Sequence, residues 1–394
     1  MKTLSFIVRL SATALMFTKF AHGFGKITLL QTSRSVSTSL LVTRMHQVPS
    51  PPVTQPISKH VAHISGPPEE AHLPSEDSYD GIVCDMDGVL WLGNEEISQS
   101  IDALKVLKFG GKSVVFVTNN SAKTKLDIQK KLASLGYDAL LKDIVTSSSV
   151  TAEYLKSTLD SKRIPKTATK VYMIGNPALE EELTAVGFQV IKVTEEESPE
   201  IDEDEFSKIS KIVTDEVEAV VVGIDYAFNY RKLAMGSLYL GRGALFVATN
   251  PDAANKVSSG ALLPEPGALI AALESVSGKV ATICGKPSDI IVKHVLDLLK
   301  CDPTRVMMVG DRLDTDIAFA NKAGVASCLV LSGCTSAEEA EDQIRNPTDE
   351  NKTPDFVAND LWDMVSPVAS ASLINLIEEI APTDDPNETP PDRR

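Results

Sequence analysis

Residues 81–91 (GIVCDMDGVLW) decide the fold. The stretch begins as a short apolar run, which is typical of a buried strand in a parallel sheet. It then places Asp85 and Asp87 one residue apart, directly before Gly88. An apolar strand that ends in carboxylates presents them at the carboxyl edge of a sheet, where open α/β folds bind ligands. Two interpretations follow: a metal-dependent site with a carboxylate nucleophile, or an ordinary Asp-Gly turn whose first Asp caps a helix.

Apolar runs alternate with helical patterns along the rest of the body, which predicts a doubly wound α/β fold with a parallel sheet. Three more of these runs are followed by polar groups. Residues 114–117 precede Thr118, Asn119 and Asn120; residues 280–283 precede Lys286; and residues 306–309 precede Asp311 and, a little further on, Asp316. We expect all four runs to be strands of one parallel sheet, so that these groups meet at its carboxyl edge.

The groups expected at this edge have complementary chemistry. Neighbouring carboxylates repel each other unless a cation lies between them, and Mg²⁺ prefers carboxylate and water oxygens. A phosphate group carries a charge of about −2 at neutral pH, so Mg²⁺ and Lys286 together would let it approach Asp85. Thr118 offers a hydroxyl and Asn119 a backbone N–H to the phosphate oxygens. These residues favour the metal-dependent interpretation over the simple turn.

Composition argues against several other kinds of site. The chain has 394 residues and a formal net charge of −16, with no acidic residue before Glu69, and such an acidic body argues against nucleic-acid binding. His294 is the one histidine beyond residue 80, so we expect neither a His-based triad nor a His-rich metal site. The five cysteines include no CxxC pair, which argues against a zinc site or a disulfide framework. Cys328 and Cys334 could form a redox pair, although two unrelated thiols are the plainer interpretation.

Four motifs, taken in order, resemble those of the haloacid-dehalogenase-type phosphohydrolase superfamily. They are DMDGVLW at 85–91, VTNNS at 117–121, GKPS at 285–288 and GDRLDTDI at 310–317. The resemblance covers residues 79–380 and implies a phosphatase, because the simple dehalogenases of the superfamily lack the second Asp of the first motif. It also implies the fold of that superfamily, a Rossmann-like core with parallel strands.

The resemblance implies a role for each motif residue. Asp85 would attack phosphorus and form an aspartyl-phosphate, and Asp87 would protonate the leaving oxygen and then deprotonate the attacking water. Mg²⁺ would be bound by the Asp85 side chain, the Asp87 backbone carbonyl and Asp311, with Asp316 supporting the metal from outside its ligand set. The phosphate group would be bound by Thr118, Asn119, Asn120 and Lys286.

The spacing of the motifs predicts an inserted domain. The interval between the first and second motifs holds one turn and one helix, whereas core strands and helices use only about half of the interval between the second and third. We therefore expect an α/β cap domain of the C2 type at residues 165–264, and a core at 79–164 and 265–380. The pattern resembles the capped group of 4-nitrophenylphosphatase-like enzymes, which includes phosphoglycolate and pyridoxal-phosphate phosphatases. That resemblance implies a homodimer formed through the cap.

We expect the cap to set the substrate, because the core motifs supply only the reaction. Animal pyridoxal-phosphate phosphatases of this group have an Arg after the Asn-Asn-Ser segment and a His in the cap. Here the matching position is Ala122, and the expected cap contains no His. These differences favour a small phosphorylated metabolite such as 2-phosphoglycolate. The alternatives are pyridoxal phosphate, glycerol 3-phosphate, sugar phosphates, a broad 4-nitrophenyl-phosphate-type activity, or a non-catalytic phospho-ligand sensor or scaffold, which the intact Asp85 and Lys286 disfavour.

The two ends of the chain have compositions that differ from the body. Residues 1–23 have a basic start, an apolar centre and small residues before Phe24, as signal peptides do. Residues 24–68 are rich in Ser, Thr and Arg, contain no acid and end in a Pro-rich linker, which is typical of a transit peptide outside the folded body. Together they resemble the bipartite presequences of complex plastids, where the oxygenase activity of carbon fixation makes 2-phosphoglycolate; a mitochondrial or secreted location is the alternative. We expect no membrane span in the mature protein and a disordered tail at 381–394.

Overall fold

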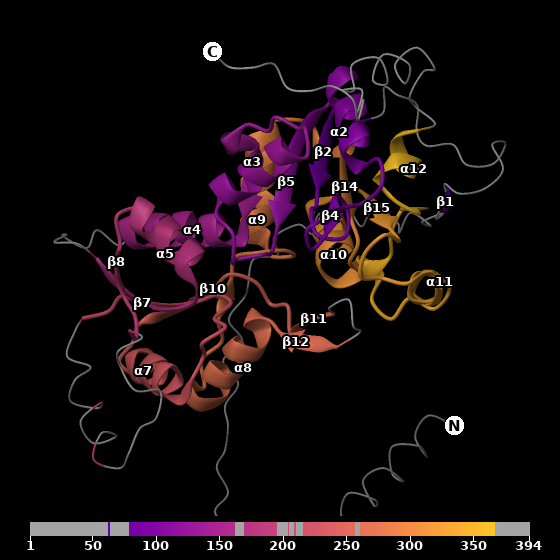
Figure 1. Ribbon diagram of the computed structural model, residues 1–394. Coiled ribbons are helices and arrows are strands. Elements are labelled where there is room, and N and C mark those ends of the chain that lie inside the picture. Colours follow the sequence, from indigo (N-terminus) through magenta and orange to yellow (C-terminus); the bar gives the residue numbers. More distant parts are fainter. Residues whose placement is uncertain are drawn as a thin grey trace, which may run out of the picture. The chain divides into compact units, whose positions relative to one another are not determined.

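The computed structural model describes residues 62–63, 79–161, 169–194, 204, 209, 216–256 and 261–366. All of them belong to one unit of the chain, residues 58–394. They form two parallel sheets with helices on both faces of each, together with two short hairpins (Figure 1). The predicted signal peptide, nearly all of the predicted transit peptide and linker, and the predicted tail lie outside the described residues.

The first sheet has seven parallel strands in the order β1–β16–β15–β14–β2–β5–β6. Strand β2 is buried along its whole length, which explains its uninterrupted apolar sequence. The chain winds from β2 toward β6 and later returns to build the other half from β14 to β16, so β2 lies where the winding direction changes. The strands are β1 (Ala62–His63), β2 (Gly81–Cys84), β5 (Ser113–Thr118), β6 (Ile144–Thr146), β14 (Val306–Gly310), β15 (Ala326–Val330) and β16 (Phe356–Ala358).

Helices cover both faces of the first sheet, because successive strand side chains alternate between the faces. Ile82 and Cys84 pack in one apolar cluster and Val83 packs in another. The first face is covered by α2 (Ser100–Phe109), α3 (Lys125–Ser134) and α12 (Leu361–Val365), and the second by α4 (Ser147–Ser161), α9 (Asp289–Leu299) and α10 (Ala318–Ala323). Helix α11 (Ala337–Arg345) begins with a capping box in which Ser336 and Glu339 satisfy each other's backbone N–H groups.

The second sheet has five parallel strands in the order β13–β10–β9–β7–β8. Helices α7 (Tyr230–Gly241) and α8 (Pro266–Ser277) cover one face, and α5 (Pro177–Ala185) packs with α4 on the other. The strands are β7 (Lys170–Ile174), β8 (Gln189–Ile191), β9 (Ala219–Val222), β10 (Leu245–Ala248) and β13 (Thr282–Ile283). The predicted α/β fold with a doubly wound parallel sheet is therefore confirmed.

Three features differ from the sequence-based predictions. Residues 280–283 were expected in the same sheet as β2, but β13 pairs in parallel with β10 of the second sheet, so that sheet extends past Pro264. Strand β1 lies within the predicted linker and pairs with β16, so that prediction is wrong for residues 62–63. The sequence also gave no indication of α11, α12 and β16, nor of the hairpins β3–β4 (Trp91–Leu92, Glu95–Glu96) and β11–β12 (Ala254–Lys256, Leu262–Pro264).

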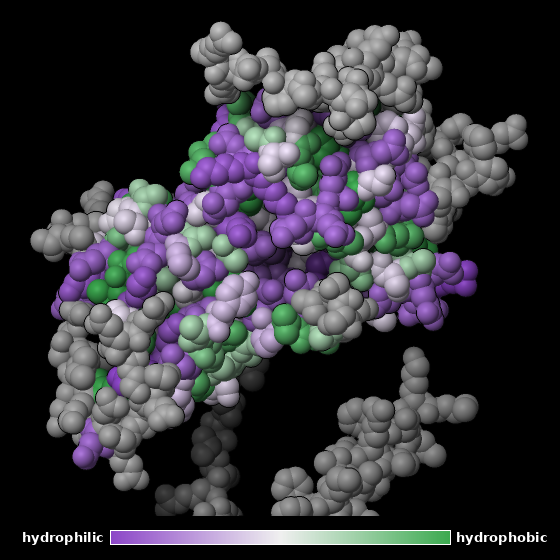
Figure 2. Space-filling view, in the orientation of Figure 1, coloured by the Kyte–Doolittle hydropathy of each residue, from purple (hydrophilic) through white to green (hydrophobic). Residues whose placement is uncertain are grey.

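The outer surface is polar over much of the face shown in Figure 2, with hydrophobic residues scattered among the hydrophilic ones. Large exposed apolar side chains include Leu140, Leu262 and Val280. Within the described part of the chain, no helix combines the length and the apolar character that a membrane crossing requires.

One apolar cluster joins the two sheets. It contains Val83 of β2 and Val221 of β9, and both pack in the cluster that surrounds Leu155 of α4, which is 0% exposed. Because the same cluster includes residues of both sheets, loss of packing at α4 should destabilise both of them. We therefore expect the two sheets to unfold together.

Leu155→Ala tests this shared packing. The substitution leaves a cavity in the cluster, and we expect the free energy of unfolding to fall by about 2–5 kcal/mol in a single transition. Urea unfolding followed by circular dichroism and by intrinsic fluorescence measures both quantities. Leu140→Ala is the matched control, since Leu140 is 58% exposed, and its expected change is within about 0.5 kcal/mol. Two separate transitions in the Leu155→Ala variant would contradict the shared cluster.

Candidate active site

Asp85 and Asp311 lie side by side because the strands before them are neighbours. Strand β2 pairs in parallel with β14, with Cys84 opposite Val309. The pairing continues one residue further, where the Asp85 N–H donates to the Val309 carbonyl at 2.9 Å. Asp85 is 6% exposed and Asp311 is 4% exposed. Two carboxylates therefore leave the carboxyl edge of the sheet together, and they are buried.

Lys286 reaches this edge from the second sheet. The chain leaves β13 through Gly285, whose N–H donates to the Thr249 carbonyl at 2.6 Å. The Lys286 side chain is 2% exposed, and its Nζ donates to Asp85 Oδ1, to Asp316 Oδ1 at 2.6 Å and to the Val117 carbonyl at 3.3 Å. An ammonium group has three N–H bonds to donate, so these acceptors satisfy it completely.

Asp316 is oriented by the turn that follows β14. Its Oδ2 accepts from the backbone N–H groups of Asp311 and Arg312, both at 3.1 Å, and its Oδ1 accepts from Lys286. The turn is a π-helical segment, Leu313–Ile317, and such segments occur often at functional sites. A Cβ at Gly310 would overlap the Asp316 side chain, so this position requires glycine.

Asp311 is held against two glycines. Its Oδ2 accepts from the Cys334 N–H at 2.6 Å. A Cβ at either Gly88 or Gly333 would overlap its carboxylate. Gly88 also has a φ of 87°, in the left-handed region that favours glycine. Gly88 of the first motif therefore has two roles: it allows the turn, and its lack of a side chain leaves the space that the Asp311 carboxylate occupies.

The three carboxylates carry more negative charge than Lys286 can balance. One oxygen of each of Asp85, Asp311 and Asp316 lies within 4.8 Å of the others, an arrangement able to hold a metal ion. Burial raises the pKa of Asp85 well above its ordinary value despite the opposing effect of Lys286, and burial together with Asp316 raises the pKa of Asp311 to about 7. Burial alone would lower the pKa of Lys286, but Asp316 and Asp85 raise it overall. A buried excess of carboxylate oxygens fits a hard divalent cation such as Mg²⁺.

Asp87 does not join this acidic group through its side chain. The residue is exposed, and its Oδ1 accepts from the indole Nε1 of Trp91 at 2.9 Å. The structure therefore brings together Asp85, Lys286, Asp311 and Asp316 as buried groups, whereas the Asp87 carboxylate lies at the solvent-facing side of the same loop.

The residues after β5 have different environments. Thr118 is buried, and its Oγ1 accepts from the Asn120 N–H at 3.0 Å, which leaves its hydroxyl proton to donate. The Asn119 side chain holds the loop of Lys286: its Oδ1 accepts from the Lys286 N–H at 2.8 Å and its Nδ2 donates to the Lys286 carbonyl at 3.0 Å. Asn120 is exposed and its Oδ1 accepts from the Ala122 N–H. The side-chain amide of Asn119 thus orients the backbone of Lys286.

Sequence analysis missed several residues around the site. Asp252, which follows β10, accepts from the side-chain amides of Asn119 at 2.9 Å and Asn250 at 2.6 Å, and lies 3.7 Å from the Arg312 guanidinium. Burial, with Asp252 nearby, raises the pKa of Glu265 to about 7. The signal that could have found Asp252 is its place in a polar Thr-Asn segment after an apolar strand, the same pattern as at Thr118.

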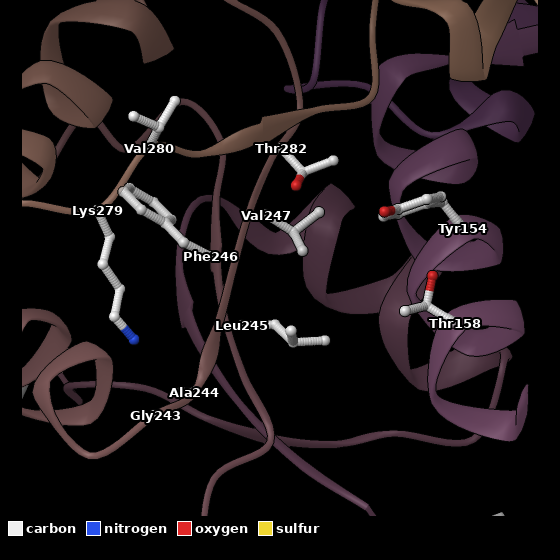
Figure 3. Close-up of a pocket in the computed structure, with 10 residues that line it drawn as sticks. All are labelled: Tyr154, Thr158, Gly243, Ala244, Leu245, Phe246, Val247, Lys279, Val280 and Thr282. Carbon is white, nitrogen blue, oxygen red and sulfur yellow. The ribbon is translucent and has the colours of Figure 1, made fainter. Parts of the chain in front are cut away.

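A cavity of about 380 Å³ lies elsewhere, between α4 and the β13 side of the second sheet (Figure 3). No member of the buried acid cluster lines it. Its lining residues are Tyr154, Thr158, Gly243, Ala244, Leu245, Phe246, Val247, Lys279, Val280 and Thr282. The polar groups that the sequence predicted for phosphate binding are therefore not part of this cavity.

Comparisons with known proteins agree with the fold. Residues 82–189 match the model of the haloacid dehalogenase-like hydrolases, and residues 283–364 match a related hydrolase model. The chain is 36% identical over 298 residues to the chloroplastic phosphoglycolate phosphatase 1A of Arabidopsis thaliana. The matched region covers 75% of this chain and 78% of that protein. The chain therefore belongs to the haloacid dehalogenase-like hydrolases and is a phosphatase of the capped group, which confirms the resemblance seen in its motifs.

Solved structures show the same likeness. A p-nitrophenyl phosphatase from Archaeoglobus fulgidus has a TM-score of 0.61 and 29% identity, covering 74% of this chain and 99% of that one. A glycerol phosphate phosphatase from Mycobacterium tuberculosis, solved in complex with magnesium, has a TM-score of 0.60 and 28% identity, covering 74% of this chain and 78% of that one.

Asp311→Asn tests the excess of buried negative charge. A folded-state pKa of about 7 against an ordinary 3.8 means that the contribution of Asp311 to stability is fully present below about pH 4 and is lost as the pH rises through about 7. We expect the metal-free variant to unfold at a higher temperature than the wild type at pH 8, by a smaller margin at pH 5, and at nearly the same temperature below about pH 4. Calorimetry in the presence of a chelator measures both. Asp297→Asn, at an exposed residue of α9, is the control; a destabilised Asp311→Asn variant at pH 8 would count against the charge excess.

Proposed function

We propose that this phosphatase hydrolyses small phosphomonoesters with the help of Mg²⁺ and through an aspartyl-phosphate at Asp85. The observation that supports this most directly is the buried ammonium of Lys286, hydrogen-bonded to both Asp85 and Asp316. A fixed positive charge beside a carboxylate at a strand end allows a phosphate dianion to approach a nucleophile that would otherwise repel it.

Mg²⁺ would be held by the side chains of Asp85 and Asp311 and by the backbone carbonyl of Asp87, with Asp316 supporting it from outside the ligand set. The fit rests on the cluster of carboxylate oxygens and on the excess negative charge that raises the pKa of Asp311. When bound, the ion would neutralise charge on the carboxylates and on the phosphate oxygens. The potential ligand atoms of this cluster are all carboxylate oxygens, which suit Mg²⁺ better than softer metals.

Asp85 is proposed to act as the nucleophile and Asp87 as the acid and base. One Asp85 oxygen bonds to phosphorus while the bond from phosphorus to the leaving oxygen breaks, and Asp87 supplies the proton to that oxygen. Water then attacks the phosphorus of the Asp85 phosphate and gives a proton to Asp87; the bond from phosphorus to the Asp85 oxygen breaks, which releases inorganic phosphate and restores the carboxylate. The two carboxylates suit different roles, because Asp85 is buried beside Lys286 while Asp87 faces solvent.

Phosphate binding is assigned to the positive charge of Lys286, whose N–H bonds are already donated to protein acceptors, and to the residues after β5. The Thr118 hydroxyl retains a proton to donate, since its oxygen accepts from the Asn120 N–H. The side chains of Asn119 and Asn120 are engaged with protein groups, so we assign their contribution to their backbone N–H groups. Asn119 has the further role of positioning Lys286.

The proposed physiological substrate is 2-phosphoglycolate. Its support is the similarity to the Arabidopsis enzyme of that name, together with Ala122 and the absence of His from residues 165–264. Glycerol 3-phosphate is the second candidate, because a glycerol phosphate phosphatase has a similar structure. Pyridoxal phosphate, sugar phosphates and broad 4-nitrophenyl-phosphate-type activity remain alternatives to be separated by assay. The intact Asp85, Lys286 and Asp311 disfavour a role as a non-catalytic sensor or scaffold.

We also propose a plastid location and a homodimer formed through the predicted cap domain, residues 165–264. The location is supported by the composition of residues 1–68 and by the chloroplastic name of the Arabidopsis relative. The dimer is supported by the resemblance to the capped phosphatases alone. Microscopy of the tagged full chain and analytical ultracentrifugation of the purified protein test these two proposals separately.

Asp85→Asn tests the nucleophile. An amide cannot form the covalent intermediate, so we expect Mg²⁺-dependent hydrolysis of 4-nitrophenyl phosphate to fall by at least about a thousandfold in kcat. Asp297→Asn makes the same chemical change at an exposed residue and should retain wild-type activity. Removal of Mg²⁺ by a chelator should abolish wild-type turnover and its return should restore it. Full activity of Asp85→Asn would overturn the mechanism.

A side-by-side measurement of kcat/KM selects the substrate. We expect 2-phosphoglycolate to exceed glycerol 3-phosphate and pyridoxal phosphate by at least about tenfold, because contacts to the non-reacting part of a substrate change transition-state binding by 1–3 kcal/mol or more. Equal values for all three would instead support a broad phosphatase. A preference for glycerol 3-phosphate would favour the second candidate.

A further inference from the structure

The Asp87 side chain is held by a buried indole. Trp91 is 3% exposed, and its Nε1 donates to Asp87 Oδ1 at 2.9 Å. The backbones of the same two residues also form a bridge, and the Gly88 N–H donates to the Trp91 carbonyl at 2.8 Å. A short closed turn therefore connects the two residues, and a packed aromatic ring fixes one oxygen of a solvent-facing carboxylate.

The indole is fixed in turn by Lys131 of α3. The Lys131 Nζ lies 3.7 Å from the centroid of the Trp91 ring and donates to the Gly93 carbonyl at 2.7 Å. A cation over the face of a Trp ring is attracted by the ring quadrupole, and this attraction strengthens when the cation is partly desolvated. Helix α3 follows β5 and Trp91 follows β2, so this contact joins the loop of the first motif to the helix behind the second.

The chemistry of the indole restricts where Asp87 can carry a proton. An indole N–H donates and never accepts, so Oδ1 remains an acceptor whether the carboxyl group is ionised or protonated. Among the described residues, Asp87 Oδ2 accepts no hydrogen bond, whereas Oδ1 accepts from Trp91. We infer that Trp91 is a positioning residue that confines the transferable proton of Asp87 to Oδ2 and holds that oxygen toward the phosphoester. This rests on the acid and base role proposed for Asp87.

The proton balance of the reaction follows from this assignment. In the first step the Oδ2–H bond breaks, and the proton passes to the leaving alcohol oxygen as its bond to phosphorus breaks. In the second step a water proton passes to Oδ2 while the water oxygen bonds to phosphorus and the bond from phosphorus to the Asp85 oxygen breaks. A carboxyl group free to rotate would present the wrong oxygen, or no proton, for part of the time.

The dependence of the rate on the leaving group separates positioning from general structural damage. A 4-nitrophenolate leaves readily without a proton, whereas a simple alcohol needs one. The quantity kcat/KM covers the steps through the first irreversible phosphoryl transfer, so it reports leaving-group protonation and excludes the later attack of water. Loss of proton positioning should therefore lower kcat/KM for alkyl phosphates and spare it for 4-nitrophenyl phosphate.

Trp91→Phe in the full chain with saturating Mg²⁺ is the first variant. It keeps an aromatic ring and removes only the N–H donor. We expect kcat/KM for glycerol 3-phosphate and 2-phosphoglycolate to fall on the order of 10- to 100-fold, and kcat/KM for 4-nitrophenyl phosphate to change by less than about threefold. Asp87→Asn should show the same pattern with a larger loss for the alkyl phosphates.

Lys131→Gln is the second variant, and it covers the case in which Trp91→Phe fails to fold. It should give a smaller selective loss for alkyl phosphates, about three- to tenfold, because the indole remains but is less firmly held. The matched control is Lys108→Gln, since the Lys108 Nζ also lies over an aromatic ring, that of Tyr137, at 5.2 Å from its centroid. Lys108→Gln should leave both kinds of substrate unchanged.

The outcomes distinguish this inference from the proposed function. Equal losses on both kinds of substrate, or no loss on either, in folded Trp91→Phe or Lys131→Gln would overturn the positioning role while wild-type turnover still supports the phosphatase mechanism. Full activity of Asp85→Asn, by contrast, would remove the mechanism itself. A selective loss for alkyl phosphates in both variants, absent from Lys108→Gln, supports the role of Trp91.

Discussion

The ion pairs that the buried ammonium of Lys286 makes with Asp85 and Asp316 are the interaction on which the site depends. Each of these charges is costly to bury alone, and their attraction offsets that cost only when the geometry is good and every N–H finds an acceptor. Here all three N–H bonds of Lys286 have acceptors, and Asp316 gains two backbone N–H donors. The arrangement satisfies Lys286 but leaves the group of carboxylates with net negative charge, which a divalent cation would balance.

This interaction connects the two sheets. Asp85 and Asp316 follow strands of the first sheet, but Lys286 follows β13 of the second. The side-chain amide of Asn119, which follows β5 of the first sheet, bonds to both the N–H and the carbonyl of Lys286. Asp252, also from the second sheet, bonds to the same Asn119 amide. The groups that are proposed to perform the chemistry and the segments that are expected to select the substrate are therefore fixed to one another by a few polar contacts. A shift of the second sheet would move Lys286 as well as the substrate-facing segments.

The sequence predicted most of the fold because its strands are short apolar runs between clear turn signals, and because polar residues follow the strands that build the site. It could not place residues 280–283, since an apolar run before Gly-Lys suits either sheet and only pairing with a distant strand decides. It could not separate Asp87 from the buried cluster either. Spacing puts two carboxylates on one loop, but the bond from Trp91 to Asp87 depends on a side-chain orientation that a motif does not encode. Asp252 was missed because its partners are distant in sequence.

Steric constraints explain how the reaction could stay fixed while the substrate varies. Gly88, Gly310 and Gly333 leave room only for the carboxylates of Asp311 and Asp316, so any side chain there would displace the acid cluster. Residues such as Tyr226, in the turn that follows β9, are by contrast exposed to solvent. Proteins named for phosphoglycolate and for glycerol phosphate can therefore be 36% and 28% identical to this chain and share one fold. The differences between them that matter for specificity are expected beyond the strand ends of the first sheet, where substitution costs little packing.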